Sequence, residues 1–226
     1  MIYIIADAGV NWRNLEDADK LIQDVVETGC DAIKFQAYQE KQITLHPRYK
    51  ELYNIMLDES SIRYLYWRCK QHNIAFMCTP MYPEAVDMLD PYVTRWKIRY
   101  SDRKNLELIN KCLNTNKNIL VSTATPYQTT SRINTLYCIS EYPPGIPELI
   151  GDCKGYKYLD LKGFDGYSCH IPEIDHIFDT VYYNNLEYLE VHIKPDSYDN
   201  YEPIYVRVSI TLDELEELVE SIRSIG

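Results

Sequence analysis

The sequence alternates from end to end between short apolar runs and longer runs with helical spacing. A strand buried on both faces is almost continuously apolar, whereas a helix covering a sheet repeats its apolar residues every three to four positions. Eight apolar runs predict strands at Ile2–Ala6, Ala32–Tyr38, Ala75–Cys78, Thr94–Arg99, Ile119–Thr123, Thr135–Ile139, the residues just before Ser168, and Tyr188–Ile193. Eight strands alternating with helices favour a single α/β domain over residues 1–226, a (β/α)8 TIM barrel.

Helical spacing and end signals predict the helices between these strands. Asn14 is placed to cap the first helix and Gly29 to end it, and Thr211 with Glu214 forms a capping box for the last. The other helices are expected near Ser61–Gln71, Pro83–Leu89, Leu106–Leu113, Pro147–Cys153 and Glu173–Tyr183, with little helix after the fifth strand. A doubly wound sheet is the alternative, but no glycine-rich phosphate loop follows the first strand.

Composition limits the function classes. A net charge of -11 argues against a general binder of nucleic acid or of anionic membranes, which needs a basic surface. An anionic substrate remains open, because a few lysines in a cleft set the local field. The sequence starts without a signal peptide or membrane span, and its seven cysteines are odd in number without a CxxC pair. Reduced thiols in the cytoplasm are the simplest interpretation.

Polar residues interrupt the apolar strands near their C-terminal ends. In a barrel, one phase of every strand points inward and all C-terminal ends surround one mouth, where barrel enzymes hold their active sites. An unpaired buried lysine is costly, so lysines here indicate an anionic ligand or paired carboxylates. The residues concerned are Lys34, Gln36, Thr79, Lys97, Arg99, Ser122, Thr123, Ser140, Ser168, His170, Glu190 and His192.

Each of these residues has a plainer interpretation when taken singly. A lone strand lysine is more often a snorkelling residue, and a lone histidine is more often a hydrogen-bonded core or surface residue than a metal ligand. For His170 and His192 the interpretation as metal ligands is strengthened by the order of the eight units and by the other polar strand ends.

Eight segments of the chain resemble, in order and spacing, the motifs of one known family. They are IIADAGVNW, DAIKFQAY, FMCTPMYPEAVDML, RWKIRYSD, ILVSTATP, LYCISEYP, FDGYSCHIP and YLEVHIKPD, between Ile4 and about Asp196. Together they resemble the barrel domain of the sialic acid synthase family. That resemblance implies condensation of phosphoenolpyruvate with N-acetylmannosamine or a related sugar aldehyde, which gives a nonulosonic 2-keto acid and phosphate.

The resemblance also implies roles for individual residues. A divalent metal ion, usually manganese, with magnesium or cobalt as alternatives, is expected on His170 and His192, where it would act as a Lewis acid on the aldehyde. Lys34 and Lys97 are expected to bind phosphoenolpyruvate. Gln36, Thr79, Ser122, Ser140 and Ser168 would donate hydrogen bonds to it, Asp7, Asp102 and Glu190 take the places of family glutamates as acid or base candidates, and Tyr142 would line the sugar pocket.

Several residues depart from the family pattern, mostly at the sugar end. Asp7 and Asp102 are one methylene shorter than the family residues, Trp12 stands at a histidine, and Cys169 at an aspartate. Ala124 stands at a glycine, Arg99 and Tyr100 at small residues, and Tyr205 lies near the place of another family aspartate. The resemblance further implies a C-terminal antifreeze-like domain that the sequence to Gly226 does not include. A longer chain, a separate lid protein, a homodimer and an enzyme without a lid all stay open.

Three functions therefore compete. The first is the metal-dependent synthase. The second is a related aldolase, or another phosphoenolpyruvate-using barrel with a different aldehyde, which the substitutions at Asp7, Trp12 and Arg99 motivate. The third is a catalytically decayed barrel that serves as a binding or scaffold module, which the absent lid and Cys169 motivate.

Overall fold

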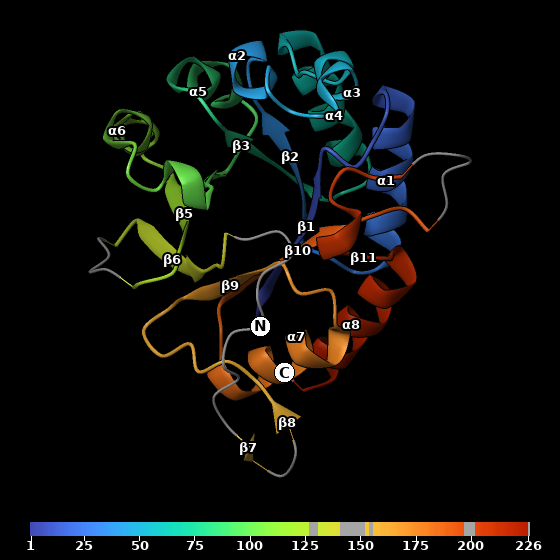
Figure 1. The fold of residues 1–226 in the computed structure, drawn as a ribbon, viewed down its shortest axis with the longest axis vertical. Coiled ribbons are helices and arrows are strands. Elements are labelled where there is room, and N and C mark those ends of the chain that lie inside the picture. The colour runs from blue at the N-terminus through green and yellow to red at the C-terminus, as the bar shows by residue number, and fades with distance from the viewer. Residues whose placement is uncertain (127–130, 141–151, 154–155, 197–201, 226) are drawn as a thin grey trace.

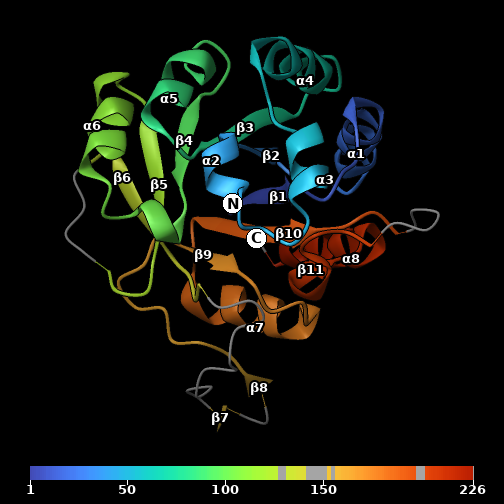
Figure 2. The same ribbon diagram turned by 45° about the horizontal axis from the view of Figure 1, so that its top comes forward.

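Eight parallel strands form the barrel in the computed structural model, which describes residues 1–126, 131–140, 152–153, 156–196 and 202–225. The strands are β1 (Tyr3–Gly9), β2 (Ala32–Ala37), β3 (Ala75–Pro80), β4 (Arg95–Ile98), β5 (Asn118–Thr123), β6 (Ile133–Tyr137), β9 (Gly166–Cys169) and β10 (Tyr188–Ile193). Their order is β3-β2-β1-β10-β9-β6-β5-β4. Because β3 and β4 also contact each other, the sheet curls into a nearly closed barrel (Figures 1 and 2). The predicted fold class is confirmed.

Helices surround the barrel on the outside (Figures 1 and 2). They are α1 (Leu15–Glu27), α2 (Glu40–Ile43), α3 (Tyr49–Asn54), α4 (Glu59–Gln71), α5 (Pro83–Leu89), α6 (Leu106–Asn114), α7 (Ile174–Asn184) and α8 (Leu212–Ser224), with 3-10 turns η1 (Tyr100–Asp102) and η2 (Val206–Val208) and a short strand β11 (Ser209–Ile210) beside β10. Asn14 and Thr211 cap α1 and α8 as predicted. None of the described helices is long and apolar enough to span a bilayer.

The helix predicted at Pro147–Cys153 is wrong at its C-terminal end. Residues 147–151 lie outside the described part, but Asp152–Cys153 forms a strand, β7, that pairs antiparallel with β8 (Tyr156–Lys157). Aspartate and cysteine rank low in helix propensity, so the local sequence does little to oppose an extended conformation.

The barrel interior has an apolar floor and a polar layer above it. Ile5, Ala32, Met77, Leu120 and Leu136 come from five strands and pack together as a small buried cluster. Side chains two residues apart on a strand share a face. The next inward residues are therefore Asp7, Lys34, Thr79, Ser122 and Cys138, all of which are buried. A larger apolar core lies between the barrel and its helices.

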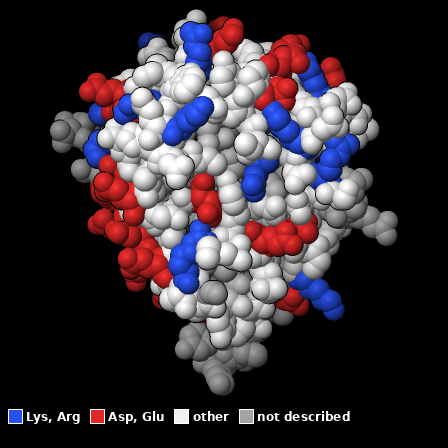
Figure 3. Space-filling view, turned by 180° about the vertical axis from the view of Figure 1, so that it is seen from behind, with Lys and Arg blue, Asp and Glu red and all other residues white. Residues whose placement is uncertain are grey.

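The surface reflects the acidic composition. On the face shown in Figure 3, acidic side chains gather along the left edge, while basic side chains are dispersed among neutral ones.

The N-terminus of α4 is capped by Asp58. Its carboxylate accepts hydrogen bonds of 2.8 Å from the backbone N–H and the hydroxyl of Ser61 and from the hydroxyl of Ser60. These bonds, the Ser61 backbone bond foremost, lower the pKa of Asp58 to about 2. The ionised cap therefore contributes stability above its unfolded pKa of about 3.9 and loses it as the pH falls towards 2.

We expect Asp58→Ala to lower the free energy of unfolding by about 1 kcal/mol at pH 7, because orphan N–H groups lose their acceptor. Urea unfolding followed by circular dichroism should show this difference narrowing as the pH falls from 6 towards 2. Asp58→Asn, which caps without a charge, should stay close to the native chain at pH 7. An equal loss for both variants at pH 7 would contradict the capping account.

Candidate active site

A pocket lies at the C-terminal ends of the strands and brings together eleven of the thirteen predicted site residues. Every strand of the barrel contributes to it directly or through the residues that follow the strand. The eleven are Asp7, Lys34, Gln36, Thr79, Lys97, Ser122, Ser140, Ser168, His170, Glu190 and His192.

Two predicted residues are not among them. Tyr142 lies outside the described residues. Asp102 does not line the pocket: it lies in η1, where its Oδ2 contacts Nε of Arg99 at 2.5 Å. Arg99 itself lines the pocket, so Asp102 borders the site through that arginine.

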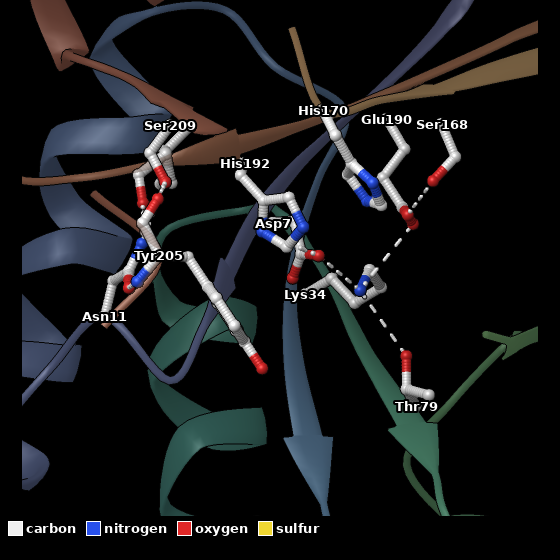
Figure 4. Close-up of polar contacts among 12 residues, drawn as sticks. Asp7, Asn11, Lys34, Thr79, Ser168, His170, Glu190, His192, Tyr205 and Ser209 are labelled. Carbon is white, nitrogen blue, oxygen red and sulfur yellow. Dashed lines mark hydrogen bonds and ion pairs between the residues drawn. The ribbon is translucent and has the colours of Figure 1, made fainter. Parts of the chain in front are cut away.

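Strand register places Asp7 at the centre of the site. On one side Asp7 is the Cα partner of Lys34 on β2, and on the other it is the partner of His192 on β10. Its Oδ2 lies 2.8 Å from Nζ of Lys34 and 3.3 Å from Nδ1 of His192 (Figure 4).

Glu190 links the two buried lysines. Its Oε1 lies 3.2 Å from Nζ of Lys97, and its Oε2 lies 3.7 Å from Nζ of Lys34. Ser168 donates a hydrogen bond of 2.9 Å to Oε1 (Figure 4). The side chains of Asp7, Lys34, Lys97 and Glu190 are each at most 5% exposed. Two ammonium groups and two carboxylates thus form a balanced, buried charge cluster.

Hydroxyl groups surround the lysines. Lys97 donates to Oγ of Ser122 at 2.7 Å, and Lys34 donates to Oγ1 of Thr79 at 3.4 Å. Hydroxyl and ammonium donors that converge in this way suit an anion such as a phosphate or a carboxylate.

The charge cluster keeps Glu190 and Lys34 ionised. Burial by itself would raise the pKa of Glu190, but Lys34 and Lys97, together with the Ser168 hydrogen bond, lower that pKa to about 2. Burial would lower the pKa of Lys34, but Asp7 and Glu190 raise it above the usual value. At neutral pH Glu190 is therefore a proton acceptor rather than a donor.

His170 and His192 lie side by side, with ring centroids 5.1 Å apart. Nδ1 of His170 is 2.7 Å from the carbonyl oxygen of Ile139, which can only accept, so Nδ1 carries the proton and Nε2 the lone pair. The carboxylate of Asp7 beside Nδ1 of His192 favours the same tautomer. Burial, followed by the neighbouring His192, lowers the pKa of His170 to about 3, and burial also lowers the pKa of His192.

Two neutral imidazoles of this kind fit a divalent metal ion. Metal-binding histidines usually direct one ring nitrogen to a carbonyl or carboxylate and the other to the metal. Within the described ranges, however, no three histidine, cysteine or acidic side chains are grouped closely enough to hold a metal ion. A metal on His170 and His192 would therefore need substrate or water to complete its coordination.

Other pocket residues are not among those predicted for the site. Met81 and Cys138 lie two residues from Thr79 and Ser140, respectively, and so share their inward-facing side of the strand. Strand periodicity could therefore have identified them. Tyr100, Ser101 and Tyr205 also line the pocket. They lie in turns, where no periodic signal exists.

Four of the family departures do not line the pocket, namely Trp12, Asp102, Ala124 and Cys169. Trp12 is buried in the core, where its Nε1 donates to the carbonyl of Gly9. Cys169 points outward from β9, and its Sγ accepts from the N–H of Ile171 at 3.3 Å. That contact is of the kind a short polar side chain makes when it holds a turn.

Comparison with known protein families identifies the family of this chain. The NeuB family matches residues 21–226, nearly the whole sequence. The chain belongs to the NeuB family. This confirms the predicted membership in the group that includes sialic acid synthases.

Two curated relatives carry synthase names. N,N'-diacetyllegionaminic acid synthase of Campylobacter jejuni is 30% identical in an alignment of 202 residues that covers 74% of this NeuB-family chain and 60% of the relative. N-acetylneuraminate-9-phosphate synthase of Drosophila melanogaster is 27% identical in an alignment of 175 residues that covers 63% of this chain and 46% of the relative. The chain thus spans less than two thirds of the length of either relative.

Solved structures share the fold. N-acetylneuraminic acid synthetase from Leptospira borgpetersenii serovar Hardjo-bovis, in complex with citrate, superposes with a TM-score of 0.78 at 21% identity, over 99% of this chain and 83% of that one. Spore coat polysaccharide biosynthesis protein SpsE of Bacillus subtilis gives 0.74 at 20% identity, over 99% of this chain and 67% of that one. At these identities the likeness establishes the fold.

We expect Glu190→Gln to lower the free energy of unfolding by about 3 kcal/mol in phosphate-free buffer, because it leaves a net positive charge in the buried cluster. Chemical denaturation measures the loss. Glu187→Gln, an exposed change three residues earlier, should stay within about 0.5 kcal/mol of the native chain. A loss below about 1 kcal/mol for Glu190→Gln would show that the lysines do not depend on this carboxylate.

Proposed function

We propose that the chain catalyses the metal-dependent condensation of phosphoenolpyruvate with an N-acetylated sugar aldehyde, giving a nonulosonic 2-keto acid and phosphate. The observation that carries the proposal is the convergence of Lys34, Lys97 and their hydroxyl neighbours next to His170 and His192 at the barrel mouth. The names of the two synthases in the family point the same way.

Phosphoenolpyruvate would bind at the lysine end. Its phosphate and carboxylate need several donors, and Lys34, Lys97, Thr79, Ser122 and Ser168 supply ammonium and hydroxyl groups within one buried space. Gln36 and Ser140, which also line the pocket, add further donors. Fixed donors of this kind also stabilise negative charge that develops on oxygen during the reaction.

Glu190 would act as a hydrogen-bond acceptor that orients water. Carbon–carbon bond formation joins the methylene carbon of phosphoenolpyruvate to the aldehyde carbon. Water must then add to the carbon that bears the phosphate before phosphate can leave. A carboxylate whose pKa is held at about 2 by two lysines accepts a proton only weakly, so it suits the orientation of water better than full deprotonation. Asp7, which contacts both Lys34 and His192, lies between the two substrate ends.

His170 and His192 would hold the metal ion, with manganese as the first candidate and magnesium or cobalt as alternatives. When bound, the ion would supply Lewis acidity to the aldehyde carbonyl. The contacts around the two histidines would keep both imidazoles neutral, in the tautomer that leaves the Nε2 lone pair available to the metal ion.

The alternatives share the fold but predict different products. Solved 3-deoxy-D-arabino-heptulosonate 7-phosphate synthase from Thermotoga maritima superposes with a TM-score of 0.66 at 12% identity, so another aldehyde on the same barrel stays a candidate. A binding or scaffold module predicts no turnover. The converging lysine and hydroxyl donors favour a site that holds an anion over a pure scaffold, and turnover distinguishes an enzyme from a binding module. The proposal also assigns the chain to the cytoplasm and leaves a homodimer or a separate lid protein as possible partners.

Phosphate release tests the proposal. The chain is incubated with phosphoenolpyruvate, MnCl₂ and a panel of N-acetylated sugars, and the product is identified by mass spectrometry. We expect phosphate release that EDTA abolishes and that MnCl₂ restores. Absence of release with every sugar, while phosphoenolpyruvate still binds by calorimetry, would overturn the synthase proposal.

We expect His170→Ala and His192→Ala each to lower kcat/KM by at least about 100-fold, since even partners behind a metal ligand are worth about 10- to 100-fold. His72→Ala, at the C-terminus of α4 and outside the pocket, should leave kcat/KM unchanged. Equal activities for all three variants would rule out a role for the histidine pair.

A further inference from the structure

The segment just before β11 is fastened to the turn that follows β1 by a fully buried side chain, Asn11. Its Nδ2 donates to the carbonyl of Ile193 at 2.8 Å and to Oγ of Ser209 at 3.0 Å, and its Oδ1 accepts from the backbone N–H of Tyr205 at 2.9 Å. Ser209 in turn donates to the carbonyl of Tyr205 at 2.7 Å (Figure 4). Both backbone polar groups of Tyr205 are therefore held by buried side chains.

The ring of Tyr205 also makes packing contacts on two sides. It lies against His192, with centroids 5.3 Å apart and planes inclined by 52°. On another side it packs over Gly9, where an added Cβ would lie 3.7 Å from Cδ2 of the ring. Gly9 has φ +51, a conformation that favours glycine, so the sequence keeps this surface free of a side chain.

This anchoring directs Tyr205 into the pocket. Tyr205 lines the same pocket as His192, and its hydroxyl is the end of the side chain farthest from Asn11 and Ser209 (Figure 4). A tyrosine hydroxyl is protonated at neutral pH and can both donate and accept a hydrogen bond.

A protonated phenol on a fixed ring suits a particular kind of ligand. The hydroxyl matches the hydroxyl or amide groups of a sugar, and the ring provides an apolar surface for its carbon skeleton. Its place beside His192 is where an aldehyde would lie if that histidine holds the metal ion.

We propose that Tyr205 is a specificity-determining residue for the second substrate, and that it hydrogen-bonds a polyhydroxylated aldehyde bound beside His192. Asn11 and Ser209 are positioning residues that act through Tyr205. This inference rests on the proposed function for the place of the aldehyde, but it assigns a residue that the proposed chemistry does not use.

Binding of an unreactive sugar alcohol tests the assignment. N-acetylmannosaminitol lacks the carbonyl and cannot condense, so calorimetry in the presence of phosphoenolpyruvate and MnCl₂ reports binding alone. Tyr205→Phe removes only the hydroxyl. We expect it to weaken sugar-alcohol binding about 10-fold, the effect of one good hydrogen bond, and to leave phosphoenolpyruvate affinity unchanged. Tyr182→Phe, an exposed tyrosine on α7, serves as the matched control and should change neither affinity.

Ser209→Ala tests the positioning role. It should weaken sugar-alcohol binding in the native background but add little to Tyr205→Phe, because both act on one group. Equal losses from Ser209→Ala in the two backgrounds would overturn its action through Tyr205.

The outcomes separate this inference from the proposed function. Equal sugar-alcohol affinity for the native chain and Tyr205→Phe, or no binding to a native chain that binds phosphoenolpyruvate, overturns the assignment of Tyr205. Phosphate release with the same sugar KM in both chains also overturns it and leaves the synthase proposal standing. If sugar-alcohol binding depends on Tyr205 but no phosphate is released, the assignment of Tyr205 stands and the synthase proposal is overturned.

Discussion

The contact on which the active-site end of the barrel depends is that of Glu190 with two buried lysines. Lys34 on β2 and Lys97 on β4 are buried side chains that line the pocket, and a buried ammonium without a counter-charge is costly. Glu190 from β10, with Asp7 from β1, supplies it. Four strands, β1, β2, β4 and β10, are thus joined by one balanced cluster. An incoming anion would meet two lysines that are already held in place by carboxylates.

Strand periodicity explains why so much of this site could be predicted from the sequence. The two-residue period that buries Ile5, Ala32 and Leu120 in the barrel floor raises Asp7, Lys34 and Ser122 into the polar layer. A polar residue in an otherwise apolar strand therefore stands out in the amino-acid sequence itself. Lys97, Ser168, Glu190 and His192 follow the same rule.

Residues outside the strands could not be predicted in this way. The family resemblance predicts Asp102 as a site residue, but in the turn η1 its carboxylate contacts Arg99 and does not line the pocket. The sequence of β7 is predicted to end a helix. A short polar segment carries no clear periodicity, so the sequence does not distinguish a strand from a helix there. Tyr205 reaches the pocket from a segment whose backbone is held by Ser209 and by Asn11, which lies 194 residues away in sequence. Long-range contacts of this kind leave no local pattern.

The two ends of the pocket are therefore built on different principles. The lysine end is carried by neighbouring strands, and a change there disturbs the charge balance of the whole barrel interior. The end beside Tyr205 is carried by a loop, which can change its side chains without loss of the barrel as long as Asn11 and Ser209 hold its backbone. Departures from the family pattern at Arg99, Tyr100 and Tyr205 all lie in such connecting segments or at strand ends. A barrel built in this way can keep one anionic substrate fixed while its loops select the other.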